Sequence, residues 1–473
     1  MKKRQQIGLL LAILVLVVTL ILPVPDGLTL AGRNTIGIAA FFLILLVTEA
    51  LPLSVSCLLT IGLTPLFGVT DRFAGAVVGF AHPVVFFIIA SFGVAGAITN
   101  VPVTKRVLLV LLRRTGSSRA GHKVCYKVER ILLAMMTATA AASFFMSNVP
   151  TCAIMMSIAL EFLDLIDDAE AKKSVGKAFM IGIPVATMIG GVSTPASSSL
   201  NLLAIGLLEQ HTGYTITFVQ WMAVGIPLVI LLIPFAWFLI IKVYKPAHIE
   251  SERIERYIEN IQIIKKMDRQ EFSVVVIIIA MLALWISSSW FPAIEVFTVA
   301  ILGCALFFMP GIKVLSWNKF VASINWDIIF ISGTVLSTAN ALVVNDVTNW
   351  LVDTLYPAHL SFQANILVGL AAVISFIMLL LITSAPALIT VLAGPFITIA
   401  LLNGVPPSFL ILVVAFCAGN CYLLPLDTVQ LLTYSKGYYK MTDMGRSTIF
   451  LQIAMVILLA LWIPFIGGIL QLN

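Results

Sequence analysis

The stretch GGVSTPASSSLN, residues 190–201, decides the fold. It places four serines, a threonine and an asparagine between two apolar arms, 177–192 and 202–208. A helix needs roughly 20 apolar residues to cross a bilayer, so each arm is too short to span it. The pattern predicts a hairpin that enters and leaves the membrane on one side, with its polar tip inside protein. An ordinary external loop is the alternative.

The composition is that of a membrane protein. Of the 473 residues, 60% are hydrophobic and 11% are charged, and the mean hydropathy is +1.08. Soluble domains carry about 25% charged residues, so this chain lacks the polar surface of one. We predict an all-α polytopic membrane protein with about 11 transmembrane helices and two re-entrant hairpins in inverted repeats.

The formal charge of +6 does not indicate a nucleic-acid partner, because the basic residues lie at the ends of apolar segments and in linkers. That distribution is typical of membrane orientation. The run MKKR at residues 1–4 precedes an apolar run to Val24 that is long enough to span and has no clear cleavage site. We therefore predict a multi-pass protein of the cell membrane with a retained first helix and a cytoplasmic N-terminus.

The two halves of the chain, 1–250 and 251–473, are alike in pattern. A mixed-charge stretch at 245–272 separates them and is predicted to be a solvated linker. HPVVFFIIASFGVAGAITNVPVT from His82 compares with NWDIIFISGTVLSTANALVVNDVT from Asn325, and both runs are apolar and rich in small residues. The chain is therefore predicted to contain two copies of one structural repeat.

Polar interruptions follow in the same order in each half. SNVPT at 147–151 compares with TSAPA at 383–387, and 190–195 compares with 419–428. Paired interruptions at corresponding places indicate a secondary transporter and its binding site. Irregular backbone at membrane depth is tolerated only inside protein or around a watery cavity.

The interruptions are rich in hydroxyls and amides and poor in fixed charge. Freed N–H groups at helix starts attract anions, and unwound carbonyls can hold cations. Two opposed clusters of this kind suit two carboxylates. The predicted cargo is therefore a small organic dianion, carried across the lipid membrane.

Four ionisable residues need separate interpretations. Asp427 falls inside the last interruption and is a candidate functional group, because acids at membrane depth are costly. Glu49 precedes Leu51-Pro52 and is predicted to mark a helix end or to pair with a basic residue. His82 and His211 are predicted to be interfacial or loop residues.

Enzymatic chemistry is not indicated. The six cysteines show neither a disulfide framework nor zinc spacing, and five of them lie in apolar stretches, where we expect small core residues. No Ser-His-Asp or metal-ligand cluster emerges from the sequence. We predict no enzyme and no cofactor, and sodium is the only metal ion that the pattern leaves open.

At these residues the chain resembles the divalent anion/sodium symporter (DASS) family of dicarboxylate and citrate transporters, over nearly its whole length. The family carries two Ser-Asn-Thr motifs at hairpin tips and two Pro-Pro-Asn-type motifs in unwound helices or their partners. The first pair is matched by Ser147, Asn148 and Thr151, and by Thr194, Ser198 and Asn201, with Ser199-Leu200 in place of the prolines. The second pair is matched by Ser384-Ala385-Pro386 (or Thr383-Ser384-Ala385) and by Leu424, Pro425 and Thr428.

The resemblance implies homodimers, inverted repeats and an elevator-like movement of a transport domain against a fixed scaffold. Together with the interruptions, it gives these candidate substrate-binding residues: Ser147, Asn148, Thr151, Thr194, Ser198, Ser199, Asn201, Thr383, Ser384 and Thr428. The candidates for holding a cation or compensating charge are Ser147, Asn148, Ser197 and Asp427.

Departures from the family pattern bear on coupling. Symporters of the family hold sodium beside the substrate at the Ser-Asn-Thr regions. Here Val149 removes a hydroxyl, Ala385 removes an amide, and Asp427 adds a carboxylate that could pair with Lys436. We therefore predict exchange of one dicarboxylate (succinate, malate, fumarate or 2-oxoglutarate) for another. Sodium-coupled symport of a dicarboxylate or citrate is the alternative, and a cation/proton antiporter using Glu49 and Asp427 is a third hypothesis.

Overall fold

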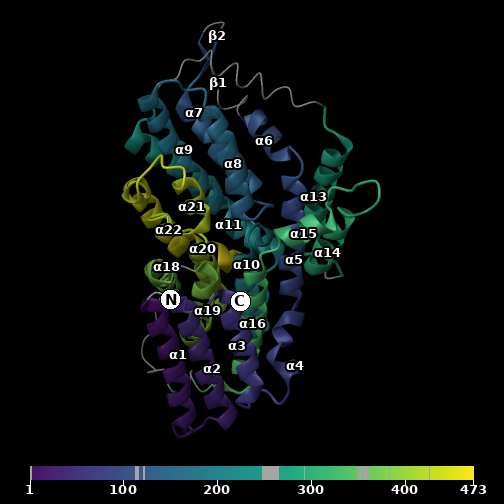
Figure 1. Ribbon diagram of the computed structural model, residues 1–473, viewed down its shortest axis with the longest axis vertical. Helices are drawn as coiled ribbons and strands as arrows, with labels where there is room; N and C mark the ends of the chain where they lie inside the picture. The colour runs from purple at the N-terminus through teal and green to yellow at the C-terminus, as the bar shows by residue number, and fades with distance from the viewer. Residues whose placement is uncertain are drawn as a thin grey trace.

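The computed structural model describes residues 3–111, 117–120, 123–247, 266–291, 293–348, 350, 354, 362–382, 384–425 and 427–472. Helices make up nearly all of it (Figure 1). The first half contains α1 (Lys3–Ile21), α2 (Leu30–Thr48), α3 (Leu53–Leu66), α4 (Phe73–Ala76), η1 (Val78–Ala81), α5 (Pro83–Thr99), α6 (Val103–Leu111), α7 (Val128–Ala142), α8 (Asn148–Leu163), α9 (Ala169–Gly190), η3 (Pro195–Ser197), α10 (Ser199–Thr212) and α11 (Phe218–Tyr244). The second half contains α13 (Arg269–Ser287), α14 (Val296–Leu306), α15 (Trp317–Ser323), α16 (Trp326–Val344), α18 (Ala364–Leu381), α19 (Ala385–Leu402), α20 (Pro407–Ala418), α21 (Thr428–Tyr434) and α22 (Met441–Leu470).

Several of these helices can cross a membrane. Six are both long and apolar enough, namely α2, α11, α13, α16, α19 and α22. The pair α5 and α6 adds a seventh span if it is counted as one, and it is bent by 65° at its break. Shorter apolar helices such as α3, α8, α14 and α20 pack among them. The predicted all-helical, polytopic architecture is confirmed.

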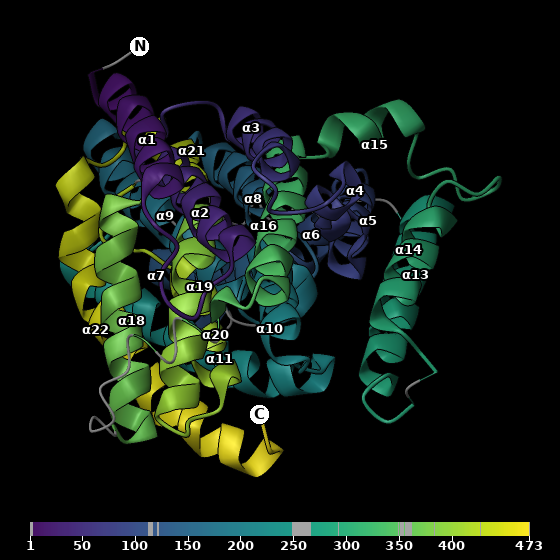
Figure 2. The same cartoon turned by 90° about the horizontal axis from the view of Figure 1, so that it is seen from below.

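Four irregular segments interrupt the bundle. The first tip (143–147) joins α7 to α8, and the second tip (382–384) joins α18 to α19. The first break (191–198) separates α9 from α10, and the second break (419–427) separates α20 from α21. α7 and α8 lie side by side in Figure 1, as do α18 and α19 in Figure 2, so each tip closes a helical hairpin.

The helices around the two breaks pack in a reciprocal way. α9 packs against α7 and α8, and α20 packs against α18 and α19, so each first arm contacts the hairpin of its own half. The second arms cross over: α10 packs against α19 and α20, whereas α21 packs against α8 and α9. The two halves therefore interlock around the tips and breaks.

The hairpin that the sequence predicts across 177–208 is wrong. α9 is 22 residues long and packs against α7, α8 and α11, whereas α10 packs against α5, α16, α19 and α20. The two arms therefore bury different surfaces and do not fold back on each other. The stretch 191–198 is an irregular segment between two successive helices, α9 and α10. The hairpins lie at the first and second tips. The predicted location of the polar stretch inside protein is correct, since residues 191–197 are all buried.

Two peripheral features complete the fold. Figure 2 shows α13 and α14 at one edge of the molecule, where α14 packs against α5. Two short antiparallel strands, β1 (Ser117–Ala120) and β2 (Lys123–Tyr126), follow α6, with Ser117 opposite Tyr126. The sequence does not predict these strands, because the polar segment that contains them has no alternating apolar face. Most of the predicted linker at 245–272 lies outside the described residues.

Candidate functional site

The first tip and the first break contact each other directly. The Thr194 hydroxyl donates a hydrogen bond to the Phe144 carbonyl at 2.8 Å, and Thr194 is 1% exposed. Asn148, the first residue of α8, lies against Gly191, where an added Cβ would be 2.6 Å from the Asn148 Oδ1 atom. Glycine at position 191 therefore lets the backbone approach this amide, and a side chain there would displace the Asn148 amide.

Side chains of the first break satisfy its own backbone. The Asn201 amide donates to the Gly191 carbonyl at 2.9 Å and to the Thr194 carbonyl at 3.0 Å. The Ser197 hydroxyl contacts the same two oxygens. Both side chains are buried, so they replace the hydrogen bonds that an unbroken helix would have provided. The irregular segment is thereby held inside the protein by its own side chains.

Helix α11 supports the first break from behind. The Trp221 indole donates to the Val192 carbonyl at 3.0 Å, and Trp221 is fully buried. Gly225, one turn further along α11, leaves room for the same carbonyl, which an added Cβ would overlap. The position of the break therefore depends on close packing as well as on its own polar residues.

Two buried oxygen atoms at the first tip have no hydrogen-bond partner among the described residues. They are the Ser143 hydroxyl and the Asn148 Oδ1 atom. Ser143 is the C-cap of α7, where the helix dipole favours a positive charge. Buried polar atoms in proteins are almost always satisfied, so these two oxygens are available to a partner other than the described residues.

The other predicted residues of the first half have more local roles. Thr151 is fully buried, and its hydroxyl donates to the Ser147 carbonyl at 3.1 Å. Ser147 is the N-cap of α8 but makes no side-chain cap, so its hydroxyl is not used to begin the helix. Ser198 does cap its helix: its hydroxyl accepts from the Leu200 N–H at 3.2 Å. Ser199 is the first residue of α10 and is partly exposed.

The second break is closed by amides and a hydroxyl from neighbouring segments. Gln452 of α22 donates to the Asn420 carbonyl at 3.3 Å, and Thr448 donates to the Tyr422 carbonyl at 2.6 Å. Gln430 of α21 donates to the Cys421 carbonyl, which lies between them. Three consecutive carbonyls in the second break are thus occupied by protein donors.

Asp427 has a capping role. Its carboxylate accepts from the Val429 N–H at 2.8 Å, and its own N–H donates to the Gln430 side chain at 3.3 Å. This reciprocal pair begins α21. Among the described residues no ion pair joins Asp427 to Lys436, which the sequence had left open.

A tyrosine completes the support of α21. The Tyr439 hydroxyl donates to the Gln430 carbonyl at 3.2 Å, and burial raises the pKa of Tyr439 to about 12. The phenol therefore stays protonated at neutral pH and remains a hydrogen-bond donor.

The second tip is only partly described. Ser384 is the N-cap of α19, is partly buried and makes no side-chain cap. Thr383 lies outside the described residues. Thr428, the first residue of α21, is exposed, whereas Val429 beside it is 4% exposed.

The structure brings the two halves of the candidate site together. The Cys152 thiol of α8 lies 3.4 Å from the Val429 carbonyl of α21. The start of α21, with Asp427 and Thr428, therefore lies beside the first turns of α8. In the same way, α10 of the first half lies beside α19 and α20 of the second half. Helices that begin at the breaks thus pack against helices of the opposite half of the chain.

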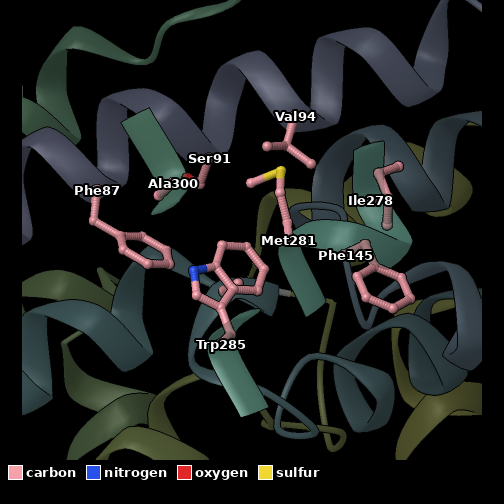
Figure 3. A pocket seen from close by; sticks show the side chains of 9 residues that line it. Phe87, Ser91, Val94, Phe145, Ile278, Met281, Trp285 and Ala300 are labelled. Atoms are coloured by element: carbon pink, nitrogen blue, oxygen red, sulfur yellow. The ribbon is translucent and has the colours of Figure 1, made fainter. Parts of the chain in front are cut away.

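Tight packing closes one side of the first tip and first break. Figure 3 shows Phe145 of the tip facing Met281 and Trp285 of α13, with Phe87 of α5 on the other side of the indole. The Trp285 ring stacks on Phe87 at a centroid distance of 5.6 Å. The space left among these residues is about 10 Å³, no more than one water molecule needs.

Sequence reasoning missed several supporting residues. Ser143, Gln430, Thr448 and Gln452 belong to the candidate site but were not predicted. The signal was present, because each is an isolated hydroxyl or amide in or beside an apolar helix. Only the packing shows that Gln430, Thr448 and Gln452 reach carbonyls of the second break, and Thr448 also contacts the Met444 carbonyl of its own helix at 2.8 Å.

The remaining predictions concern residues away from the site. Glu49 ends α2 in a left-handed conformation with φ of 49°, so the predicted helix end is confirmed. His82 is the N-cap of α5, and His211 lies in the last turn of α10. The five cysteines predicted to be core residues, Cys57, Cys152, Cys304, Cys417 and Cys421, are all buried and free.

Nearly the whole chain matches a known protein family. The family model described as the sodium:sulfate symporter transmembrane region matches residues 3–472. The sodium-dependent dicarboxylate transporter SdcS of Staphylococcus aureus (strain USA300) is 24% identical over 500 residues, which cover 98% of this chain and 92% of that protein. A membrane protein of Cupriavidus necator is 24% identical over 454 residues, covering 89% of this chain and 84% of that protein.

Solved structures share the fold at low identity. The YdaH transporter of Alcanivorax borkumensis aligns with a TM-score of 0.58 and 15% identity, over 85% of this chain and 89% of that one. MtrF of Neisseria gonorrhoeae aligns with a TM-score of 0.60 and 12% identity, over 98% and 95%. With a family match along nearly its full length, the chain is a membrane transporter and not an enzyme, and it belongs to the sodium:sulfate symporter (DASS) family.

Proposed function

We propose that this chain carries four- and five-carbon dicarboxylates, such as succinate, malate, fumarate and 2-oxoglutarate, across the cell membrane together with sodium. The related staphylococcal proteins are named sodium-dependent dicarboxylate transporters. The observation that carries the proposal is the pair of buried, unpartnered oxygens at the first tip, on Ser143 and Asn148. Ser143 ends α7, and the Asn148 Oδ1 atom lies against Gly191, which ends α9, so both oxygens lie beside a helix C-terminus, which favours a cation.

The anion is assigned to the helix starts. Helices α8, α10 and α19 begin at the tips and the first break, and their first N–H groups carry partial positive charge. The hydroxyls of Ser147 and Ser384 do not cap these helices, so they are free to donate to a carboxylate. Thr428 is exposed at the start of α21 and adds a further hydroxyl. One carboxylate at each half of the site would suit a dianion.

Exchange of one dicarboxylate for another is the second candidate. The observation that favours it is the closed state of the second break, where the carbonyls of Asn420, Cys421 and Tyr422 already accept from protein donors. A second sodium ion would have to displace these donors. The asymmetry supports either a single coupled sodium ion or no coupling ion at all.

Uptake in proteoliposomes separates these functions. Labelled succinate uptake is measured with and without an inward sodium gradient, and with and without dicarboxylate inside. Sodium symport predicts that the gradient drives uptake into empty vesicles. Uptake that needs internal dicarboxylate and ignores sodium would establish exchange and refute the first proposal.

Variants of the first tip test the assignment of the cation. Ser143→Ala and Asn148→Ala should each raise the sodium concentration needed for half-maximal uptake. Ser408→Ala is the matched control, because Ser408 is also buried and unpartnered but lies at the far end of α20 from the break. An equal effect of the control would show that loss of any buried hydroxyl impairs transport.

The orientation is assigned from charge. Helix direction alternates along the chain, so the start of α1 and the ends of α2, α5 and α11 fall on one face, where the Gln5 amide contacts the Glu49 carbonyl. Of the described basic residues, Arg33 and Arg72 alone lie on the opposite face. The positive-inside rule then places the N-terminus in the cytoplasm. An N-terminal epitope tag that external protease removes from intact cells would contradict this.

The two halves, 1–250 and 251–473, are proposed to be inverted repeats that move as an elevator within a homodimer. The reciprocal packing of α10 and α21 supports the repeat relationship. The elevator movement and the dimer rest on the family resemblance. Mass measurement of the detergent-solubilised protein, corrected for bound detergent, distinguishes a dimer from a monomer.

A further inference from the structure

A large apolar cavity lies outside the tips and breaks. Its volume is about 710 Å³, within the usual range of about 300–1,000 Å³ for a ligand pocket. One wall comes from α2 and α16 and includes Ala40 and Ala339, and the other comes from α10 and α19 and includes Val391 and Gly394. The cavity therefore lies between the two pairs of helices, which also contact each other through α10 with α16 and α2 with α19.

Four of the polar side chains in its wall, Thr338, Thr390, Asn403 and His211, already have hydrogen-bond partners. The hydroxyls of Thr338 and Thr390 donate to backbone carbonyls of their own helices at 2.9 Å and 2.8 Å. The Asn403 amide donates to the Ile399 carbonyl at 2.8 Å. His211, the one ionisable residue among the described lining residues, is hydrogen-bonded through Nδ1 to its own helix at 2.8 Å. A dicarboxylate would find few partners here, so the cavity calls for an apolar ligand.

The cavity is continuous with the lipid-facing surface. Ile399 lines it and is 39% exposed, and Val343 of α16, next to the lining residue Leu342, is 41% exposed. On α18, which packs against α19, Ile374 and Ile377 are 45% and 55% exposed. Exposed apolar side chains of a membrane-spanning helix face acyl chains. Lipid can therefore reach the opening without crossing polar groups.

The packing around the first hairpin, formed by α7 and α8, shows that a cavity beside a hairpin is not a general feature of this fold. There, α5, α13 and α14 pack closely against the first tip, and Met281 and Trp285 fill the space (Figure 3). Protein interiors pack as densely as organic crystals, and empty volume forfeits favourable contacts. The gap beside α19 is therefore expected to be filled.

We propose that an acyl chain of a membrane phospholipid inserts between α2 and α16 on one side and α10 and α19 on the other. The acyl chain supplies the apolar contacts that the protein side chains leave unmade. The headgroup of the same phospholipid stays at the membrane surface near the end of α19. This lipid site is separate from the dicarboxylate site and does not depend on the identity of the cargo.

Photo-crosslinking in proteoliposomes tests the proposal. The probe is a phosphatidylcholine with a diazirine near the middle of one acyl chain, and labelled peptides are mapped by mass spectrometry. An added Cβ at Gly394 meets open space, so Gly394→Phe should place a ring in the cavity and Gly394→Ala should leave it open. We expect label on residues 390–402 in the parent and in Gly394→Ala, and less of it in Gly394→Phe. Label on the outer surface of α22, at Ile457 and Leu461, should persist in all three.

A cysteine variant provides an independent measurement, should Gly394→Phe fail to fold. Gly394→Cys should resist both a lipid-soluble maleimide and a charged methanethiosulfonate reagent in the folded protein, because a thiol among acyl chains does not ionise, and it should react with both after unfolding. Reaction with the charged reagent would show that water fills the cavity, and a disulfide between two Gly394→Cys chains would assign it to a second copy. Either result, or unchanged acyl labelling of Gly394→Phe, would overturn the lipid site.

Discussion

Asn201 is the residue whose removal should most clearly separate binding from folding. Its amide has two hydrogens and serves the carbonyls of Gly191 and Thr194. Ser197 contacts both oxygens but has a single hydroxyl hydrogen, so it can donate to only one at a time. In Asn201→Ala the Gly191 carbonyl keeps the Ser197 hydroxyl and the Thr194 carbonyl keeps the Ser197 N–H at 3.3 Å, so the break loses two buried hydrogen bonds.

The size of the effect follows from the hydrogen bonds that Asn201→Ala removes. A buried hydrogen bond contributes about 0.5–1.5 kcal/mol, so the loss of two costs about 1–3 kcal/mol, and here the cost falls on the ordered form of the first break. If only the ordered form binds substrate, the KM for succinate rises in proportion to its lost population. Each 1.4 kcal/mol is a factor of ten, so the KM rises by at most about 5- to 150-fold.

The assay is initial-rate uptake of labelled succinate in proteoliposomes, with thermal unfolding of the same preparations. Asn34→Ala is the matched control. Asn34 is 7% exposed and donates to the Phe67 carbonyl at 2.7 Å, but it lies on α2, away from the tips and breaks. Both variants should unfold at lower temperature, whereas only Asn201→Ala should raise KM. An unchanged KM in Asn201→Ala, or an equal rise in Asn34→Ala, would refute the reasoning.

Three further predictions concern packing, charge and capping. Gly225→Ala should abolish transport and lower the yield of folded protein, because its Cβ overlaps a backbone carbonyl, whereas Gly468→Ala meets open space and should behave as the parent in size-exclusion chromatography. Glu271 is 1% exposed and pairs with Arg106, so Glu271→Ala leaves an unpaired charge and should destabilise the protein by about 3 kcal/mol in thermal unfolding. The double variant Arg106→Leu/Glu271→Leu removes both charges and should recover part of that loss. Asp427→Asn keeps an N-cap oxygen and should retain sodium-driven uptake, whereas Asp427→Ala should cost about 1 kcal/mol of stability; loss of uptake in Asp427→Asn alone would show that the charge is required.

The structure changes what the departures from the family motif imply about sodium coupling. Val149 is 38% exposed, so the hydroxyl that is missing there is missing from an accessible surface and not from the buried group around Ser143 and Asn148. Asp427 is used to begin α21. Neither change removes a ligand from the first tip, and for this reason the proposal moves from exchange toward sodium coupling.

Much of this protein was determined by the sequence alone. Long apolar runs with few charges permit only membrane-spanning helices, so the fold class followed from composition. The four polar interruptions were visible because hydroxyls, amides and prolines are costly in an apolar run, and all four coincide with irregular segments in the structure. Thr194, Ser197 and Asn201 lie together because they belong to one short stretch.

Only the tertiary structure decided which interruptions are hairpin tips and which are breaks. Both kinds look alike along the chain, and the distinction depends on what each arm packs against: α10 contacts α19, whereas α8 contacts α7. The support of the second break by Gln452 and Thr448 was also invisible, since an amide in an apolar helix does not indicate which distant carbonyl it will meet. Such pairings arise from long-range contacts between surfaces, and no local pattern encodes them.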